Sequence, residues 1–487
     1  MCGQFRPYTV LDKSWGNPAI RRMRNPFNDL RYANSFAVLS EKMIKNRELS
    51  IQKLASSKKE ANRYYSFLKS KRVSVEETIR MSCAIRPEMV ANRDVLHIGD
   101  TSTYNLSKRK GRIQDMEKLG VLQDGKTPGF FLHAGMAVDA ERMTILGLAD
   151  VQLWNRPKVD APTIEGQPKK LADKESYKWY VGSQNANNAL QAAGRVTHLY
   201  DSEADSFALM EGIIDELKND LIIRAHHNRQ VIWKGQQLSL SECLDQSEAL
   251  GRYEIKLRAL DHYSWTAGKR IRRKAREAVI ELRAVKVELL APAESNNKRK
   301  LPLYMVEARE TTADLPKGEQ PVIWRLWTTH VVESFDQAKK IVDFYNGRWM
   351  IEQLFRTTKK KGFNQEATEL ETTEAILKQA TIVISTACKV LQLVYARDKY
   401  QGLPIGDGFN STQQELLQKL NTQLQGNTEK QKNPFPPDQL GWAAWVIARL
   451  GGWKGYQSAK PPGPLTMKYG VEKFYTLLQG YLLFNSS

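Results

Sequence analysis

Two short apolar runs that each end at an aspartate constrain this chain most strongly. The run 95–99 (VLHIG) ends at Asp100, and the run 196–200 (VTHLY) ends at Asp201. We expect both runs to be buried β-strands, because short apolar runs bounded by polar residues are typical of strands in a sheet core. Carboxylates at the ends of neighbouring strands can bind divalent metal ions. Either aspartate alone is more often a turn or cap residue.

The segments around these runs predict an α/β fold with a mixed sheet. Strand patterns alternate with helical patterns, which is typical of sheets that contain both parallel and antiparallel strands. The predicted strands are 95–100, 130–138, 143–151, 196–200, 221–224 and 322–328, and the predicted helices between them are 172–194 and 206–217.

A second strand pattern, alternation with period two, occupies residues 253–258 and 279–287. Between these segments lies the basic run Lys269–Arg276. We expect a long antiparallel ribbon with a basic tip. The tip is either a solvated loop or a loop that binds phosphate groups.

Helical patterns dominate both ends of the chain. Residues 1–75 are basic, with Arg21, Arg22 and Arg24 ahead of the first helical pattern, and they form either a solvated bundle or a DNA-binding domain. Residues 400–440 are rich in Gln, Asn and Pro, which predicts a loop. The other predicted elements are long helices over 334–361 and 372–397, shorter helices over 440–450 and 471–484, and a linker at 461–464.

The composition favours a polyanionic partner and excludes several other classes. There are 73 Lys and Arg against 54 Asp and Glu, a formal net charge of +19, and neutralised phosphates release counterions. The four cysteines are far apart, so neither a disulfide framework nor a zinc knuckle is predicted. We find no apolar signal core, and the most apolar segment, 375–395, is interrupted by Lys378 and Lys389.

Four side chains of types that can bind metal or phosphate lie on one predicted helix. Tyr345, Arg348, Glu352 and Lys359 stand at offsets of 0, 3, 7 and 14 residues. At about 100° per residue they fall near 0°, 300°, 340° and 320°, which is one narrow stripe. This stripe suits a surface that faces DNA, where the acid completes a metal site and the other side chains hold phosphates. An ordinary ion-pair ladder, with Arg348 and Glu352 four residues apart, would give the same pattern.

Together these residues resemble a known family, the bacterial cut-and-paste transposases of the DDE class, in the branch with a Tyr-Arg-Glu-Lys signature. The resemblance spans nearly the whole chain, and the signature fits at all four spacings. The other matching segments are Asp100-Thr101-Ser102, Asp201-Ser202-Glu203-Ala204-Asp205 with one change, Trp324 ahead of Val332-Glu333-Ser334, Trp349 after the signature arginine, and residues 448–452.

The resemblance implies an RNase H-like catalytic core, with an inserted antiparallel β ribbon and all-helical domains on either side. It implies that Asp100, Asp201 and Glu352 are catalytic and bind two Mg²⁺ ions per active site, with Mn²⁺ expected to substitute. The implied domains are a helical DNA-binding domain (1–75), the catalytic domain (76–370, with its β insertion at about 230–320) and a helical C-terminal dimerisation domain (371–487).

The resemblance also implies what the protein acts on. It would nick DNA at transposon ends, form and open a hairpin, and transfer the 3′ end into target DNA. Its partners would be the terminal inverted repeats, the target DNA and a second copy of the chain in a synaptic complex, in the bacterial cytoplasm at the nucleoid and without a membrane. Without the resemblance, the apolar C-terminal helices are equally explained by packing within one chain.

The implied DNA contacts come from five residues. Trp324 would stack on a flipped base, and Tyr345, Arg348 and Lys359 would hold backbone phosphates. Arg224 matches a DNA-contacting arginine of the family. Two positions depart from the family pattern: His226 replaces a lysine, and Ser66 replaces an arginine. Of the implied functions, recognition of the transposon ends is therefore the one that the resemblance supports least.

Four other interpretations stay open at this point. A catalytically inactive DNA-binding protein would have lost a triad carboxylate, and none is missing. A nuclease that only hydrolyses DNA would use the same acids. A glycosidase would use a pair of carboxylates, but the charge of +19 disfavours it. A tyrosine recombinase would use Tyr345 as its nucleophile, but we find no supporting Arg/His/Arg set.

Overall fold

The computed structural model describes residues 29–46, 49–156, 175–264, 269–292, 298–311, 315–316, 319–359, 362–399, 402–456 and 461–484. They form two compact units: unit 1 falls within residues 1–196 and 349–487, and unit 2 within residues 197–348. Arg21, Arg22 and Arg24 lie outside the described residues. The fold is α/β, with a mixed sheet and flanking helices, as the sequence predicted, and it is consistent with an RNase H-like core.

The sheet of unit 1 is an antiparallel arrangement of β1 (Asp94–Asn105), β2 (Gly129–Asp139) and β3 (Thr144–Trp154). β2 is buried along its whole length, and β3 along nearly all of it. The prediction that β1 ends at Asp100 is wrong: the strand continues for five further residues. Their polar side chains suggested a loop, but they pair with the apolar start of β2, from Thr101 with His133 to Asn105 with Gly129.

The two faces of β1 carry different side chains, because successive residues of a strand point to opposite sides. Asp100 and Tyr104 share one face, and the hydroxyl of Tyr104 is hydrogen-bonded to that of Thr358 in α11 (Trp349–Thr358) at 2.5 Å. Thr101 shares the other face with His133, whose ring meets Trp179 of α7 (Tyr177–Ala189) edge-on at 4.8 Å between centroids. Asp100 therefore lies on the face that α11 covers.

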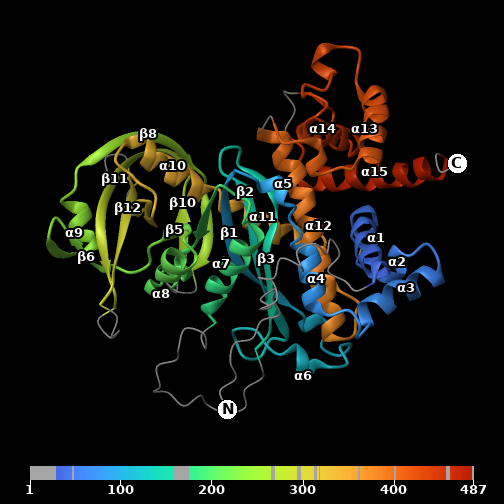
Figure 1. Cartoon of the computed structure of the whole chain (residues 1–487), viewed down its shortest axis with the longest axis horizontal. Helices are drawn as coiled ribbons and strands as arrows, with labels where there is room; N and C mark the ends of the chain where they lie inside the picture. The colour runs from blue at the N-terminus through green and yellow to red at the C-terminus, as the bar shows by residue number, and fades with distance from the viewer. Residues whose placement is uncertain are drawn as a thin grey trace. The chain divides into compact units, whose positions relative to one another are not determined.

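The helix α12 (Thr373–Lys399) is the core helix of unit 1, packed against α1 (Leu30–Asn46) and α4 (Val75–Ser82) (Figure 1). Among the described residues, its segment Thr373–Ala396 alone is long and apolar enough to cross a membrane, and 83% of the window tested is buried inside the protein. Its buried polar groups also hold the N-terminal helices. Thr386 pairs with Ser40 at 2.6 Å.

The C-terminal helices of unit 1 are α13 (Ser411–Leu424), α14 (Leu440–Leu450) and α15 (Pro464–Phe484), which lie together in Figure 1. The prediction of a loop over 400–440 is wrong. The polar segment forms α13, capped by Asn410 and Gln413, and it buries Leu416, Leu417 and Leu420. Pro464 does not belong to a linker either, because it is the first residue of α15, a position that proline favours.

Unit 2 contains the mixed part of the sheet. β4 (Arg195–Tyr200), across which the division between the units falls, runs parallel to β5 (Asp220–Arg224). From β5 the order continues, all antiparallel, through β13 (Ile323–Thr328), β12 (Lys300–Glu310), β11 (Arg276–Leu290), β6 (Gln230–Trp233) and β7 (Gln236–Ser239), and β8 (Ala249–Leu257) also pairs with β11.

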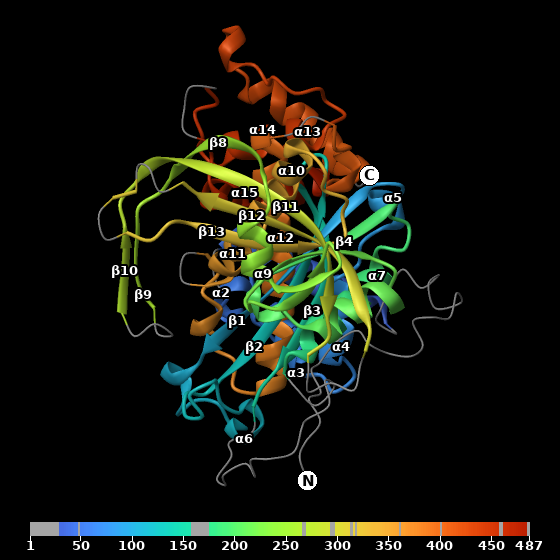
Figure 2. The same cartoon turned by 90° about the vertical axis from the view of Figure 1, so that its left-hand side faces the viewer.

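A separate two-stranded ribbon joins β9 (Leu260–Ser264) to β10 (Lys269–Arg273) (Figure 2). The predicted antiparallel ribbon is confirmed by the pairing of β8 with β11, but most of the basic run belongs to the strand β10 and not to a loop. Residues 265–268, which join the two strands, lie outside the described residues.

The two faces of the unit 2 sheet are covered by different helices. Phe335 of α10 (Phe335–Asn346) packs on Tyr253, with ring centroids 6.2 Å apart. On the other face, Arg325 contacts Ser241 of α9 (Leu240–Asp245) at 3.1 Å and the buried Glu307 at 2.7 Å. Trp324, next to Arg325, therefore points toward the α10 side.

The remaining described helices and helical turns are shorter. They are α2 Ile51–Leu54, α3 Lys58–Lys69, α5 Pro87–Val90, α6 Met116–Leu119, α8 Phe207–Glu211, and turns at Ser107–Arg109, Ser202–Ala204, Gly212–Glu216, Gln365–Ala367, Ile405–Asp407 and Glu429–Gln431.

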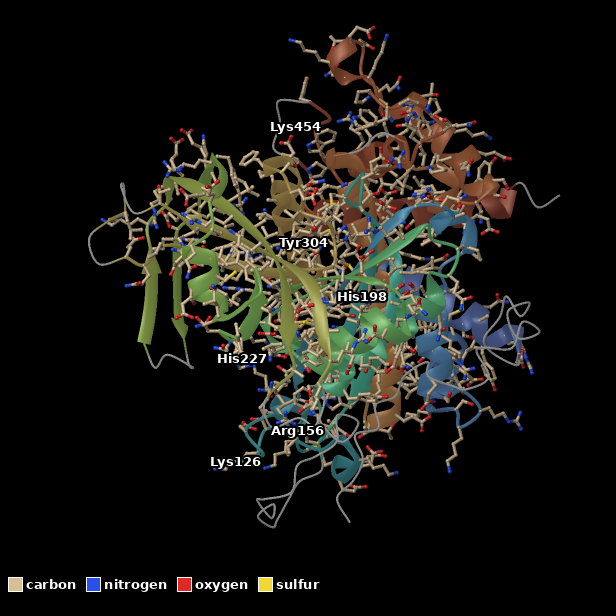
Figure 3. All side chains as sticks on the ribbon, turned by 60° about the vertical axis from the view of Figure 1, so that its left-hand side comes forward. Lys126, Arg156, His198, His227, Tyr304 and Lys454 are labelled. Atoms are coloured by element: carbon tan, nitrogen blue, oxygen red, sulfur yellow. The ribbon has the colours of Figure 1, made fainter. Side chains whose placement is uncertain are left out.

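We predict that Gly120→Ala destabilises unit 1 by about 3 kcal/mol or more. Gly120 has φ +72° and ψ −159°, a conformation that other residues avoid, and a Cβ there would overlap the carbonyl oxygen of Arg156, which Figure 3 labels. Gly125 is the matched control, because φ is +67° there but no atom lies within 4 Å of the position that a Cβ would occupy. Urea unfolding of Gly125→Ala should show a loss of only about 1 kcal/mol; equal losses would contradict the packing at Arg156.

Candidate active site

Tyr345 is the centre of a cluster of predicted site residues in unit 2. Its phenol is 7% exposed, and it receives a hydrogen bond from Arg224. Burial raises the pKa of Tyr345, the positive charges of Arg348 and Arg224 lower it, and the negative charge of Asp201 raises it. Trp324 meets Tyr345 with ring centroids 6.3 Å apart and an interplanar angle of 60°. Residues from β5, β13 and α10 therefore meet beside Asp201.

A buried aspartate fixes the loop that follows Arg224. Both oxygens of Asp205 are used: one accepts the backbone N–H groups of His226 and His227 at 2.7 and 3.0 Å, and the other accepts from Arg229 at 3.0 Å. The side chain of Asp205 is fully buried in this ion pair. Because Asp205 is four residues after Asp201, this bonding holds the loop with His227 (Figure 3) to the segment that carries Asp201.

The two predicted metal-binding aspartates are held by similar local bonds. Oδ1 of Asp100 accepts the backbone N–H of Thr101 at 2.7 Å, and Oδ1 of Asp201 accepts that of Glu203 at 2.9 Å. Asp201 thereby caps the helical turn Ser202–Ala204. A hydrogen bond to a backbone donor restricts the rotation of each carboxylate, which is a requirement for a preorganised ligand.

Glu352 lies in α11 of unit 1, and Lys359 is the first residue after that helix. At the end of that helix, the ammonium of Lys359 lies 5.3 Å from the ring centroid of Tyr104. Burial lowers the pKa of Lys359, and the charge of Glu366 counteracts that effect. The same Glu366 accepts the backbone N–H of Asn105 at 3.0 Å. The chain therefore reaches the end of β1 as α11 ends, on the face that carries Asp100.

The predicted single helix over 334–361 is wrong. The chain leaves α10 at Asn346, and α11 begins at Trp349. The backbone N–H of Arg348 bonds the carbonyl of Tyr345 at 3.0 Å, three residues back, which tightens the last turn. Gly347, a weak helix former, stands at the break. Tyr345 and Arg348 therefore belong to unit 2 and Glu352 belongs to unit 1, and the four signature residues are not carried by one helix.

The predicted metal ligands also come from both units. Asp100 and Glu352 are in unit 1, and Asp201 is in unit 2. In the described part of the chain, no group of three or more His, Cys, Asp or Glu side chains is placed to hold a metal ion. The donor chemistry nevertheless fits: all three residues supply carboxylate oxygens, the ligands that Mg²⁺ and Mn²⁺ prefer.

Comparison with known protein families gives a match that covers part of both units. Residues 199–388 match the family model of the transposase DDE domain. The match supports a DDE-type DNA transposase, a class that uses divalent metal ions for its nuclease and recombination chemistry. The matched segment includes Asp201, Glu352 and the basic cluster around Tyr345, whereas Asp100 lies ahead of it.

Two features near the site were missed by the sequence interpretation. Asp205 was treated only as part of a motif, although it fixes the loop after Arg224. Trp349, matched only by its position, has an exposed fraction of 59%, which is unusual for tryptophan. No sequence pattern separates an exposed tryptophan from a buried one.

Asp150 is a buried acid in β3, on the side of the sheet that α7 covers. Burial raises the pKa of Asp150 to about 6, although hydrogen bonds from Gln152 and Asn185, at 2.8 and 2.6 Å, lower it. The folded protein therefore binds this proton more tightly than the unfolded chain does. The stabilisation is complete below the ordinary value of 3.8 and is lost as the pH rises through about 6.

We predict that Asp150→Asn removes this pH dependence. Relative to the wild-type protein, the variant should gain stability by about 3 kcal/mol in total as the pH is raised from 4 to 7. Urea unfolding across that pH range measures the difference. A difference that stays constant with pH would show that Asp150 does not titrate in this range.

Proposed function

We propose that this chain is a cut-and-paste DNA transposase of the Tyr-Arg-Glu-Lys branch and that it resembles the transposase of the composite kanamycin transposon, "transposon five". Asp100, Asp201 and Glu352 bind two Mg²⁺ ions per active site, which Mn²⁺ can replace. The cluster of Arg224, Arg348, Tyr345 and Trp324 beside Asp201 carries the proposal. It places positive charge and aromatic surface, the two requirements for gripping an unpaired nucleotide, next to a carboxylate.

Glu352 lies in α11, the helix that covers the face of β1 carrying Asp100. Thr358 is bonded to Tyr104, and Glu352 is six residues earlier in α11, about 9 Å along a helix. Asp100 is four residues before Tyr104, about 13 Å along a strand. Catalysis requires Asp201 of unit 2 to bind the same metal ions as Asp100 and Glu352.

Each chemical step is an in-line displacement at phosphorus. Bound Mg²⁺ would activate the attacking oxygen and stabilise the leaving 3′ oxygen. The protein residues hold the phosphates: Arg224 and Arg348 donate hydrogen bonds, and Lys359 contributes charge. The same arrangement serves nicking, hairpin formation, hairpin opening and transfer of the 3′ end to target DNA, because every step has the same geometry.

Tyr345 acts as a phosphate ligand and not as a nucleophile. It is buried, and the pKa of its phenol is raised, so the hydroxyl keeps its proton at neutral pH. A tyrosine recombinase needs a phenol that loses its proton. Tyr345 instead accepts a hydrogen bond from Arg224, which fixes its position for donating to a phosphate oxygen.

Trp324 supplies the stacking surface for a flipped base. Its side chain is partly exposed on the α10 side of β13, and its contact with Tyr345 fixes its ring. Stacking of an extruded base on an aromatic ring relieves the strain of a tight DNA hairpin. This position next to the phosphate-binding cluster favours hairpin chemistry over simple hydrolysis.

The roles of the three domains and the location of the protein belong to the same proposal. Residues 1–75 form the domain that binds the terminal inverted repeats, residues 76–370 are catalytic, and residues 371–487 mediate a homodimer in the synaptic complex. The chain acts on DNA in the bacterial cytoplasm, at the nucleoid.

We predict that Asp100→Asn, Asp201→Asn and Glu352→Gln each reduce Mg²⁺-dependent nicking by at least about 10³-fold, because each removes a charged ligand. DNA binding, measured by mobility shift, should change less than about threefold, since the phosphate contacts come from other residues. Glu254→Gln, an exposed acid of β8, is the control and should retain activity. Full nicking by any of the three variants would contradict the metal assignment.

We predict that Trp324→Ala slows hairpin formation about tenfold or more while first-strand nicking changes little, because only the hairpin step needs an extruded base. Trp324→Phe, which keeps an aromatic ring, should retain most of the hairpin rate. Gel analysis of end-labelled DNA resolves both products. Equal slowing of the two steps would remove the stacking role, and absence of any hairpin product from the wild-type protein would favour a hydrolytic nuclease.

A further inference from the structure

Thr101 connects the two faces of β1. Its backbone N–H donates to Oδ1 of Asp100 at 2.7 Å, on the face that α11 covers. Its hydroxyl lies 3.0 Å from Nδ1 of His133 on the opposite face. These two residues are also direct cross-strand partners in the register of β1 and β2. Thr101 is therefore bonded both to a proposed catalytic acid and to a buried ring behind the sheet.

His133 is held rigidly by its surroundings. Its side chain is fully buried, and its ring meets Trp179 at an interplanar angle of 88°. α7 approaches closely because residue 182 is glycine: a Cβ there would lie 3.3 Å from Nε2 of His133 and 3.1 Å from Oδ2 of Asp150. The ring has no room to turn away from Thr101.

The ring of His133 is neutral, which suits its contact with a hydroxyl. Burial lowers the pKa of His133 well below its ordinary value, and the nearby charge of Lys178 lowers it further. A hydroxyl can pair with Nδ1 of either neutral tautomer, since it both donates and accepts. The contact therefore persists through the neutral pH range.

We propose that Thr101 and His133 are positioning residues that hold the Asp100 carboxylate from behind the sheet. His133 fixes the hydroxyl of Thr101, and with it the rotamer and the direction of the adjacent N–H, to which the carboxylate is bonded. The role at the metal site rests on the proposed function, because it matters to metal binding only if Asp100 is a ligand. Residues that orient a metal ligand commonly change metal affinity by about 10- to 100-fold when they are replaced.

The first test measures how well the backbone amide of residue 101 is protected from exchange with solvent. It depends on neither metal nor activity. Thr101→Val keeps the branched shape and removes only the hydroxyl. We expect hydrogen–deuterium exchange at the amide of residue 101, followed by mass spectrometry of the full chain, to become about fivefold faster in Thr101→Val and in His133→Leu. Thr101→Ser, which restores the hydroxyl, should exchange at the wild-type rate.

The second test measures binding of Mn²⁺ to the full chain by the electron paramagnetic resonance signal of the free ion. Thr101→Val should raise the half-saturating Mn²⁺ concentration about tenfold. The double variant Thr101→Val, His133→Leu should raise it no further, since both changes break one contact. Thr101→Ser should stay within about twofold of the wild-type protein.

Thr386→Val is the matched control, because it also removes a buried hydroxyl hydrogen bond from unit 1 but lies in α12, bonded to Ser40. It should lower the thermal midpoint as much as Thr101→Val does and leave both readouts unchanged. Unchanged amide exchange in Thr101→Val, or an equal effect of Thr386→Val, would overturn the inference. Absence of Mn²⁺ binding that depends on Asp100 would instead contradict the proposed function, and amide exchange would still decide the role of Thr101.

Discussion

A carboxylate binds a metal ion more tightly if its direction is fixed before the metal arrives. For the two proposed ligands, Asp100 and Asp201, backbone N–H groups supply that constraint: each accepts a hydrogen bond from a donor one or two residues further along the chain. Both donors lie in regular or capped segments, so they cannot follow a rotating side chain. The position of the sheet therefore fixes the direction of the two carboxylates, and the surrounding residues need only supply charge and shape.

The basic cluster of unit 2 shows how charge is kept available near such an acid. Arg224 and Arg348 act on a buried tyrosine, and Asp205 fixes the loop that follows Arg224. Elsewhere in unit 2, arginines on the α9 face of the sheet are paired with buried glutamates, as Arg325 is with Glu307. The strands are thus stabilised by ion pairs on the α9 face, while the α10 side carries Trp324 and Tyr345.

Particular elements explain where the sequence was and was not sufficient. The apolar runs before Asp100 and Asp201 predicted strands correctly, because burial on both sides demands continuous apolar residues. The end of β1 was wrong because Thr101 to Asn105 are polar, and only their pairing with β2 makes them a strand. The long helix through Arg348 was wrong because the spacing of side chains cannot reveal a break, although Gly347 was a signal.

By itself, the sequence determined the α/β class and the types of residue available for chemistry, because apolar periodicity and charge are local properties. Tertiary structure alone decided which residues meet: that Tyr345 contacts Arg224 and Trp324, that Thr101 is bonded to His133, and that Glu352 and Tyr345 belong to different units. These contacts join residues far apart along the chain, and strand register and burial determine them. No spacing along the chain encodes either quantity.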